Sequence, residues 1–194
     1  LMDALISLGL IDDTIVLFTS DHGCHFKTRN AEYKRSCHES SVRVPTILTG
    51  PGFIGGGEVR ALFSTVDIAP TLLDAAGLPI PPAMSGASIL PVLRDRTARW
   101  REEAFIQLSE SQTGRAIRTR RWKYAVTAPY DHDRQDADVY REDCLYDLDN
   151  DPYELTNLAG MATFREVADD MKARLSGWIG RIEGKTPAIE TATG

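Results

Sequence analysis

The chain has no excess of basic residues, no long apolar run and few cysteines. Its 194 residues carry 22 Lys and Arg against 28 Asp and Glu, a formal net charge of −6. General binders of nucleic acid or of anionic membranes need the opposite sign, so both classes are excluded. No run approaches the roughly 18 apolar residues of a membrane span, and three cysteines are too few for a disulfide framework. A hydrophobic fraction of 42% instead predicts a folded core.

The first residues lack both a start methionine and a leader pattern. The chain opens Leu-Met-Asp-Ala-Leu, without the charged segment, apolar segment and cleavage site of a signal peptide. Leu1, Leu5 and Leu8 instead fall on one face of a helix that Gly9 would end. We therefore expect the sequence to be a piece of a longer protein, whose compartment it does not reveal.

The first hundred residues have the pattern of an α/β core. Residues 14–20 (TIVLFTS) form an apolar, β-branched run, which is typical of a parallel strand covered by helices on both sides. The other expected elements are a strand at 44–48, a short strand at 58–65 and helices at 67–76 and 88–94. We assign residues 1–100 to this core.

After residue 100 the pattern changes to the short, alternating runs of an antiparallel sheet. Strands are expected at 104–108, 115–119, 122–126 and 144–147. Residues 163–182 carry the apolar stripe of an amphipathic helix that packs on this sheet, formed by Phe164, Val167, Met171, Leu175, Trp178 and Ile182. We assign 101–182 to a C-terminal subdomain of sheet plus helix, and the small, polar residues 183–194 to a flexible tail.

The side chains best suited to chemistry lie in residues 20–45. Asp21 and His22 directly follow the first expected strand, and ligands of open parallel sheets bind beyond the carboxyl ends of strands. A carboxylate and an imidazole there form half of a divalent-metal site, and Gly23 allows a sharp turn. The alternative is a plain Asp-His-Gly turn in which Asp21 caps the residues that follow.

Two further patterns overlap this segment. Cys24-His25 and Cys37-His38 offer the ligand types of a tetrahedral zinc site, although adjacent ligands diverge and such sites prefer two to four intervening residues. The segment is also locally cationic, because three acidic residues are outnumbered by Lys27, Arg29, Lys34, Arg35 and Arg43. That excess favours a bound anion; the alternative is a solvated surface loop.

Several motifs resemble the sulfatase family of the alkaline-phosphatase-like superfamily. Residues 19–23 (TSDHG) resemble its second metal-ligand segment, and residues 34–45 (KRSCHESSVRVP) resemble the segment with a Lys five residues before a Glu and Arg-Val-Pro opening a strand. Residues 145–158 (LYDLDNDPYELTNL) are similar to the C-terminal signature, and 62–73 to a helix entry. The resemblance implies an α/β fold: the C-terminal part of an alkaline-phosphatase-like parallel-sheet core, followed by a small antiparallel sheet with a packing helix.

The resemblance also implies a role for each polar residue of the segment. Asp21 would ligate Ca²⁺, or Mg²⁺ or Mn²⁺ in some relatives, and His22 would be a second ligand or a close, catalytic contact of the ester. Lys34 would contact the sulfate and the bridging oxygen and stabilise charge as the ester breaks. His25 and His38 are expected to bind substrate in the same pocket, His38 with a catalytic part. A buried pair that positions the loop is expected between Glu39 and Arg43.

The family's nucleophile is missing from the sequence. Such sulfatases use a formylglycine made in a Cys/Ser-x-Pro-x-Arg motif, and none of Cys24, Cys37 and Cys144 lies in one. The first pair of metal carboxylates is missing too. The resemblance therefore implies the C-terminal portion of a sulfatase that is inactive alone, with the formylglycine upstream. Its partners would be the missing N-terminal part and a sulfated small molecule or glycan; a homo-oligomer is left open.

Two other functions stay open. A phosphodiesterase or phosphonate monoester hydrolase of the same superfamily fits Asp-His, although the motif at 145–158 favours a sulfatase. A non-catalytic remnant that binds an anion or a partner is the third hypothesis. Elsewhere, the basic residues of 115–123 are interpreted as a charged strand face, the acidic residues of 131–138 as a solvated loop, and Asp147, Asp149, Asp151 and Glu154 as turn-forming.

Overall fold

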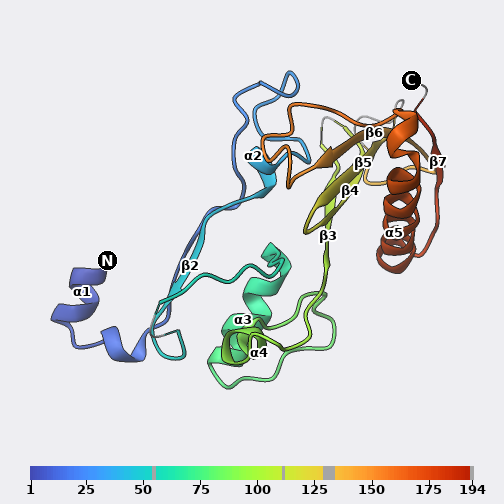
Figure 1. Cartoon of the computed structure of the whole chain (residues 1–194). Coiled ribbons are helices and arrows are strands. Elements are labelled where there is room, and N and C mark those ends of the chain that lie inside the picture. The colour runs from blue at the N-terminus through green and yellow to red at the C-terminus, as the bar shows by residue number, and fades with distance from the viewer. Residues whose placement is uncertain (54–55, 111, 129–133, 193–194) are drawn as a thin grey trace. The chain divides into compact units, whose positions relative to one another are not determined.

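The computed structural model describes residues 1–53, 56–110, 112–128 and 134–192 (Figure 1), and the chain forms two compact units. The first comprises Leu1–Asp21 and Val44–Arg101, and the second comprises His22–Arg43 and Glu102–Gly194. The segment with Lys34 and the candidate histidines thus belongs with the C-terminal half of the chain. The division into 1–100, 101–182 and 183–194 stays a prediction. In the described ranges, no helix is long and apolar enough to cross a membrane.

The first unit contains short helices and one two-stranded sheet. Its elements are α1 (Met2–Ser7), a 3₁₀ turn (Ile11–Asp13), β1 (Val16–Thr19), β2 (Thr46–Thr49), a second 3₁₀ turn (Thr65–Asp67), α3 (Ile68–Ala75) and α4 (Leu90–Arg94). These confirm the expected helices at 67–76 and 88–94 and the strands at 14–20 and 44–48. Before α3, Ser64 and Asp67 form a capping box, and Arg101 donates to both oxygens of the buried Asp67 carboxylate.

The pairing of β1 differs from the parallel arrangement that its sequence suggests. β1 pairs antiparallel with β2, so that Phe18 lies opposite Ile47. The segment 22–43 between the two strands leaves the first unit and returns to it, which brings β2 alongside β1 in the opposite direction. Directly opposed side chains share one face of a sheet. Phe18 is 62% exposed and Ile47 59% exposed, so this face of the ribbon is apolar and open within the described residues.

The strand expected at 58–65 is wrong, because none forms at the described positions 56–65. The backbone carbonyls that a strand ladder would use are taken by side chains instead. The indole N–H of Trp100 donates to the Leu62 carbonyl at 2.8 Å, and the guanidinium of Arg96 donates to the Glu58 carbonyl at 2.7 Å. Tertiary side-chain contacts therefore override a weak strand pattern here.

The second unit is built on a five-stranded mixed sheet. Four strands pair antiparallel in chain order, namely β3 (Glu103–Leu108), β4 (Gly114–Thr119), β5 (Trp122–Thr127) and β6 (Val139–Asp147). The expected antiparallel sheet is confirmed, with β6 longer than its predicted range. β7 (Ala188–Glu190) pairs parallel to β6 and lies within the segment that the sequence suggests is a tail.

Helix α5 (Arg165–Glu183) follows a 3₁₀ turn (Ala162–Phe164) and covers one face of this sheet (Figure 1). Its buried side chains pack on Ile117, Tyr124, Val126 and Leu145 of the sheet, and they are Ala168, Met171, Leu175 and Ile179. The expected stripe is wrong at Ile182, which is 47% exposed in the last turn. Gly184 ends the helix there, with a left-handed φ of 71°.

The opposite face of the sheet is covered by the segment 22–43, which contains α2 (Glu39–Val42). Cys37 of this segment packs into a small apolar cluster with Ala116, Ala125, Cys144, Tyr146 and Leu148. The sheet of the second unit therefore lies between α5 on one side and the candidate site segment on the other.

The charged strand face expected at 115–123 is wrong at two positions. Arg115 and Lys123 are fully buried rather than exposed to solvent. Each is neutralised by carboxylates that are distant in sequence, since Arg115 pairs with Glu183, and Lys123 pairs with Glu39 and Glu154. Successive side chains of β4 and β5 do alternate between the two faces of the sheet, but both faces are covered.

Candidate functional site

The turn that follows His22 is held against α2 by its backbone. The Gly23 N–H donates to the Ser41 carbonyl at 2.7 Å. A Cβ atom on Gly23 would lie only 2.1 Å from the Ser40 carbonyl oxygen, so the backbone approach requires glycine. The glycine of Asp-His-Gly is thus explained by close packing of two backbone segments.

The structure brings His22 and Lys34 together. Lys34 Nζ lies 2.9 Å from His22 Nε2, and His22 Nδ1 lies 2.7 Å from the Gly23 carbonyl oxygen. Because a carbonyl only accepts, Nδ1 carries the proton and Nε2 accepts from the Lys34 ammonium. An ammonium has three N–H donors, and this contact uses one of them. The imidazole therefore orients a cation that has further donors for the oxygens of an anion.

His25 and His38 lie near each other; His25 is buried and His38 is half-buried. His25 is 2% exposed, and within the described ranges neither of its ring nitrogens nor Nδ1 of His38 has a hydrogen-bond partner. His38 Nε2 lies 3.2 Å from the Tyr146 hydroxyl. Burial, and then the Arg29 and Lys123 cations, lower the pKa of His38 to about 4, so this ring is neutral at pH 7. Buried ring nitrogens without protein partners indicate a place for a polar ligand or for water.

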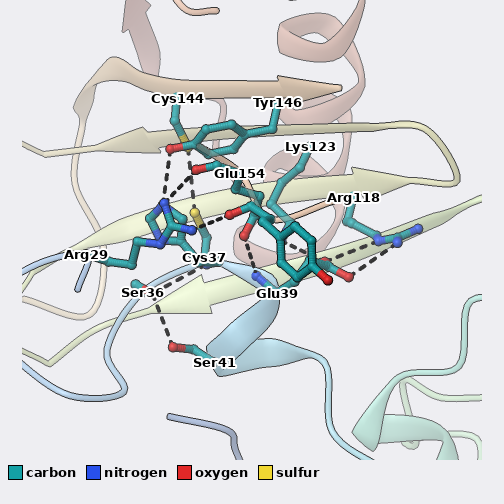
Figure 2. Close-up of polar contacts among 12 residues, drawn as sticks. Arg29, Ser36, Cys37, Glu39, Ser41, Arg118, Lys123, Cys144, Tyr146 and Glu154 are labelled. Carbon is teal, nitrogen blue, oxygen red and sulfur yellow. Dashed lines mark hydrogen bonds and ion pairs between the residues drawn. The ribbon is translucent and has the colours of Figure 1, made fainter. Parts of the chain in front are cut away.

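A buried ion network fixes the start of α2 on the sheet (Figure 2). Lys123 Nζ lies 2.7 Å from an oxygen of Glu39 and 2.7 Å from an oxygen of Glu154. The Glu39 N–H, in the first turn of α2, donates to the other Glu154 oxygen at 2.7 Å. Burial raises the pKa of Glu39, but Lys123 and Arg118 outweigh burial and lower it overall. Glu39 is therefore ionised at neutral pH, and the residue before it, His38, has a fixed place.

Arg29 holds the earlier part of the segment 22–43 against the loop that contains Glu154. Its guanidinium donates to the carbonyl oxygens of Tyr153 and, at 2.5 Å, of Glu154. Glu154 has a φ of 55°, a left-handed conformation that is uncommon for residues with side chains. In this conformation the carbonyl of Glu154 meets Arg29, while its carboxylate meets Lys123 and the start of α2. Glu154 thus joins three parts of the second unit.

Asp21 lies at the end of the first unit, directly after Ser20. Its carboxylate is exposed, and the Ser20 hydroxyl donates to it at 3.5 Å. His22, its neighbour in the sequence, belongs to the second unit. The approach of the Asp21 carboxylate to Lys34 therefore stays a prediction.

The described residues do not by themselves fit a complete metal site. Within them, no group of three or more His, Cys, Asp or Glu side chains could hold an ion. Calcium takes six to eight oxygen ligands, whereas Asp21 offers one carboxylate and His22 Nε2 accepts from an ammonium. The zinc alternative gains no support, because Cys37 lies against Cys144, with 3.8 Å between the sulfurs.

Two interpretations of acidic residues are wrong. Glu39 forms no buried pair with Arg43, which is exposed; it pairs with Lys123 instead. Glu154 does not merely form a turn, because its side chain is 2% exposed and carries the ion network. Residues 131–133 of the acidic stretch lie outside the described residues.

The structure adds four residues that sequence reasoning missed, namely Arg29, Lys123, Tyr146 and Glu154. Tyr146 and Glu154 lie in the motif at 145–158, which is the signal that could have pointed to them. The strand period gives the direction of the Lys123 side chain but not its burial. Arg29 carries no signal beyond the cationic composition of its segment.

Known proteins match this chain over most of its length. Residues 31–179 match the family model described as N-sulphoglucosamine sulphohydrolase, C-terminal. Arylsulfatase K of Bos taurus is 36% identical over 182 residues, which cover 89% of this chain and 32% of that protein. The chain spans about a third of the length of the curated relatives that it matches.

Solved structures agree with the expected fold. BT4656, solved in complex with its substrate D-glucosamine-2-N,6-O-disulfate, has 27% sequence identity and a TM-score of 0.81, and the match covers 96% of this chain and 38% of that chain. The phosphonate monoester hydrolase of Agrobacterium radiobacter has 27% identity and a TM-score of 0.75, covering 93% of this chain and 38% of that chain. The α/β fold class implied by the motifs is confirmed.

Proposed function

The chain belongs to the sulfatases, in the family of the C-terminal region of N-sulphoglucosamine sulphohydrolase, and we propose that it supplies the anion-binding part of a sulfate ester hydrolase. The observation that carries this proposal is the 2.9 Å contact of Lys34 with His22, which orients an ammonium within a cationic segment. We assign catalytic roles to Lys34, His22 and His38, and substrate binding to Lys34, His25 and His38.

Lys34 is the residue that meets the sulfate. As the ester bond breaks, negative charge grows on the sulfuryl oxygens and on the leaving oxygen, and an oriented ammonium stabilises that charge. His22 accepts one N–H of Lys34 and leaves the others for these oxygens. Losing one such donor typically lowers the rate by about 10²- to 10³-fold, which sets the expected effect of removing the ammonium.

His38 supplies a neutral hydrogen-bond donor to the same anion. Burial raises the pKa of Tyr146, so its hydroxyl keeps its proton and donates to His38 Nε2. Nδ1 of the neutral ring then carries the remaining proton, without a protein partner in the described ranges. His25, buried beside it, offers ring nitrogens to the same ligand.

Asp21 is our proposed carboxylate ligand of a Ca²⁺ ion, with Mg²⁺ or Mn²⁺ as alternatives. His22 would be the second ligand if its Nε2 turned from Lys34 to the ion, and while it keeps the Lys34 contact it would be a close contact of the ester. Hard cations prefer carboxylate oxygens, and Asp21 is adjacent to His22 in the sequence. The remaining ligands and the formylglycine nucleophile are expected from outside this chain. The chain alone is therefore expected to be inactive, and its substrate to be a sulfated small molecule or glycan.

The experiment compares the chain alone with the same chain joined to the N-terminal part of a sulfatase that carries the nucleophile motif. Hydrolysis of an aryl sulfate should appear only in the joined protein. Lys34→Met should then lower kcat/KM by about 10²- to 10³-fold. Lys27→Met, an exposed lysine of the same segment, is the matched control and should have little effect. Full activity of Lys34→Met would overturn the assignment.

A phosphonate monoester or phosphodiester is the second candidate substrate. The match to a phosphonate monoester hydrolase favours it, and an ammonium also suits phosphonate oxygens. The ratio of kcat/KM for an aryl sulfate to that for an aryl phosphonate, measured on the joined protein, separates the two reactions. A joined protein that binds sulfate and hydrolyses neither ester would favour the non-catalytic alternative.

A further inference from the structure

Two buried cysteines connect the candidate site segment to the sheet. Cys37 lies between Lys34 and α2, and Cys144 lies in β6, 107 positions further along the chain. Their sulfurs are 3.8 Å apart and both side chains are 3% exposed (Figure 2). The third cysteine, Cys24, is partly exposed, and its sulfur accepts from the Phe26 N–H at 3.4 Å. The structure therefore selects one pair out of three thiols.

The two backbone segments allow a closer approach of the sulfurs. A disulfide bond is about 2.05 Å long, so the sulfurs would have to come closer by about 1.8 Å. Cys37 lies in a bend outside regular helix or strand. Cys144 lies next to a register shift in the β5–β6 ladder, where Ala125 pairs with Cys144 and Val126 with Glu142. The backbone can shift more easily at such irregular positions than in the middle of a regular ladder, because the ladder hydrogen bonds are already interrupted there.

We propose that Cys37 and Cys144 form a reversible disulfide that locks the site segment onto β6, with a small hydroperoxide as the oxidant. One thiolate attacks hydrogen peroxide, its sulfur becomes a sulfenic acid, and hydroxide leaves. The second sulfur attacks the sulfenic sulfur, so that the S–S bond forms and water leaves. Overall, two thiols and one hydrogen peroxide give one disulfide and two water molecules, and the sulfurs lose two electrons to the peroxide.

The reduced pair persists at neutral pH without this oxidant. The hydrogen bond to Cys37 and burial raise the pKa of Cys144, so the thiolate that reacts is scarce. The apolar cluster around the pair also keeps out bulky disulfide reagents. A small, uncharged peroxide is therefore the class of oxidant that fits this position.

The lock would act on the proposed site because Cys37 directly precedes His38. This functional consequence rests on the proposed function, whereas the cross-link itself does not. A bond from residue 37 to residue 144 closes a loop of about 107 residues, and long closed loops restrict the unfolded chain most. We expect the oxidised chain to melt roughly 5–15 °C higher than the reduced chain.

The test treats the reduced 194-residue chain with hydrogen peroxide and maps its tryptic peptides by mass spectrometry. Each cysteine falls on its own peptide, since Cys24 lies on 1–27, Cys37 on 36–43 and Cys144 on 142–165. The expected product is 36–43 linked to 142–165, less two hydrogens, and reversed by a phosphine reductant. Amide exchange over 22–43 should slow, whereas β1 and β2 should not change.

Alanine variants give the matched comparison. Cys24→Ala should keep the cross-link and the melting shift, and Cys37→Ala and Cys144→Ala should lose both. If a variant does not fold, the peptide map of the unaltered chain decides alone.

Three free thiols after treatment, a link to Cys24, a link between two chains, or sulfenic or sulfonic acid without a link would each overturn the proposal. A linked chain with unchanged exchange over 22–43 would overturn the lock. Sulfate ester hydrolysis is not measured, so these outcomes leave the proposed function unaffected.

Discussion

Replacing Lys123 by Met tests whether the ion network under α2 holds the second unit together. Lys123 is fully buried and lies 2.7 Å from both Glu39 and Glu154. Lys123→Met keeps the length of the side chain and removes its charge. The two buried carboxylates then lose the cation that lies between them. Arg118, 3.4 Å from Glu39, still contacts one of them.

The size of the effect follows from the burial of the carboxylates. Breaking a buried ion pair by removing one partner typically costs about 3–5 kcal/mol, because the other charge stays buried without compensation. We expect a loss of this size in the free energy of unfolding of the second unit. Since about 1.4 kcal/mol is a tenfold change in an equilibrium constant, exchange of the most protected amides should speed up by about 10²- to 10³-fold or more.

The assay is hydrogen–deuterium exchange of β5 and β6, which reports on the second unit alone. Arg120→Met removes one positive charge from the exposed end of the same hairpin and should change stability by less than about 0.5 kcal/mol. The triple variant Lys123→Met, Glu39→Gln, Glu154→Gln removes all three charges and should recover most of the loss. A cost below about 1 kcal/mol for Lys123→Met, or no recovery in the triple variant, would refute the reasoning.

Three other changes test separate contacts. Gly23→Ala puts a methyl group 2.1 Å from the Ser40 carbonyl oxygen, so amide exchange over 22–43 should rise at least about tenfold while β1 is unaffected; equal exchange would show that the turn is not confined. The pKa of His38 is lowered from 6.5 to about 4 in the folded chain, so the unfolded chain binds the proton more tightly. Allowing for solvent screening of this half-buried ring, protonation of His38 should lower the stability by roughly 1–2 kcal/mol as the pH falls from 6.5 to 4. Urea titrations of His38→Phe should lack that part of the loss, and parallel pH curves for the two proteins would contradict it. Because Phe18 and Ile47 expose an apolar face, we expect the chain to self-associate in sedimentation and the double variant Phe18→Lys, Ile47→Lys to self-associate less; equal sedimentation of the two proteins would contradict this.

The sequence predicts the second unit better than the first, for a physical reason. Its strands and α5 show strong periodicity, and their partners follow one another along the chain. The apolar run at 14–20 has no such local partner, and its pairing depends on where a segment 22 residues long returns. The strand expected at 58–65 fails because Trp100 and Arg96 take its carbonyls, and no local pattern announces such distant side chains.

The site shows the same contrast between local and distant information. The sequence singles out His22, Lys34 and His38 as candidate site residues, because each lies in a short motif that can be recognised from neighbouring residues alone. The residues that hold them in place, such as Lys123, lie far along the chain. The alternation of side chains along a strand gives the face on which Lys123 lies, but it cannot show that this face is buried when both faces of the sheet are covered. Glu154 illustrates the limit, because a turn motif predicts its position but not the ion network that its carboxylate enters.

The ion network makes more sense as a device for position than as a source of stability. A buried ion network is often no more stable than apolar side chains of the same volume, since desolvation offsets the Coulomb attraction. Apolar packing has no direction, whereas the Lys123 and Glu154 contacts fix both the side chain and the N–H of Glu39. Glu39 is the first residue of α2, and His38 is its neighbour. In the triple variant we therefore expect recovered stability together with altered placement of His38. Its imidazole resonances should move although the unit melts normally, and unchanged resonances would show that the polar contacts are not what places this ring.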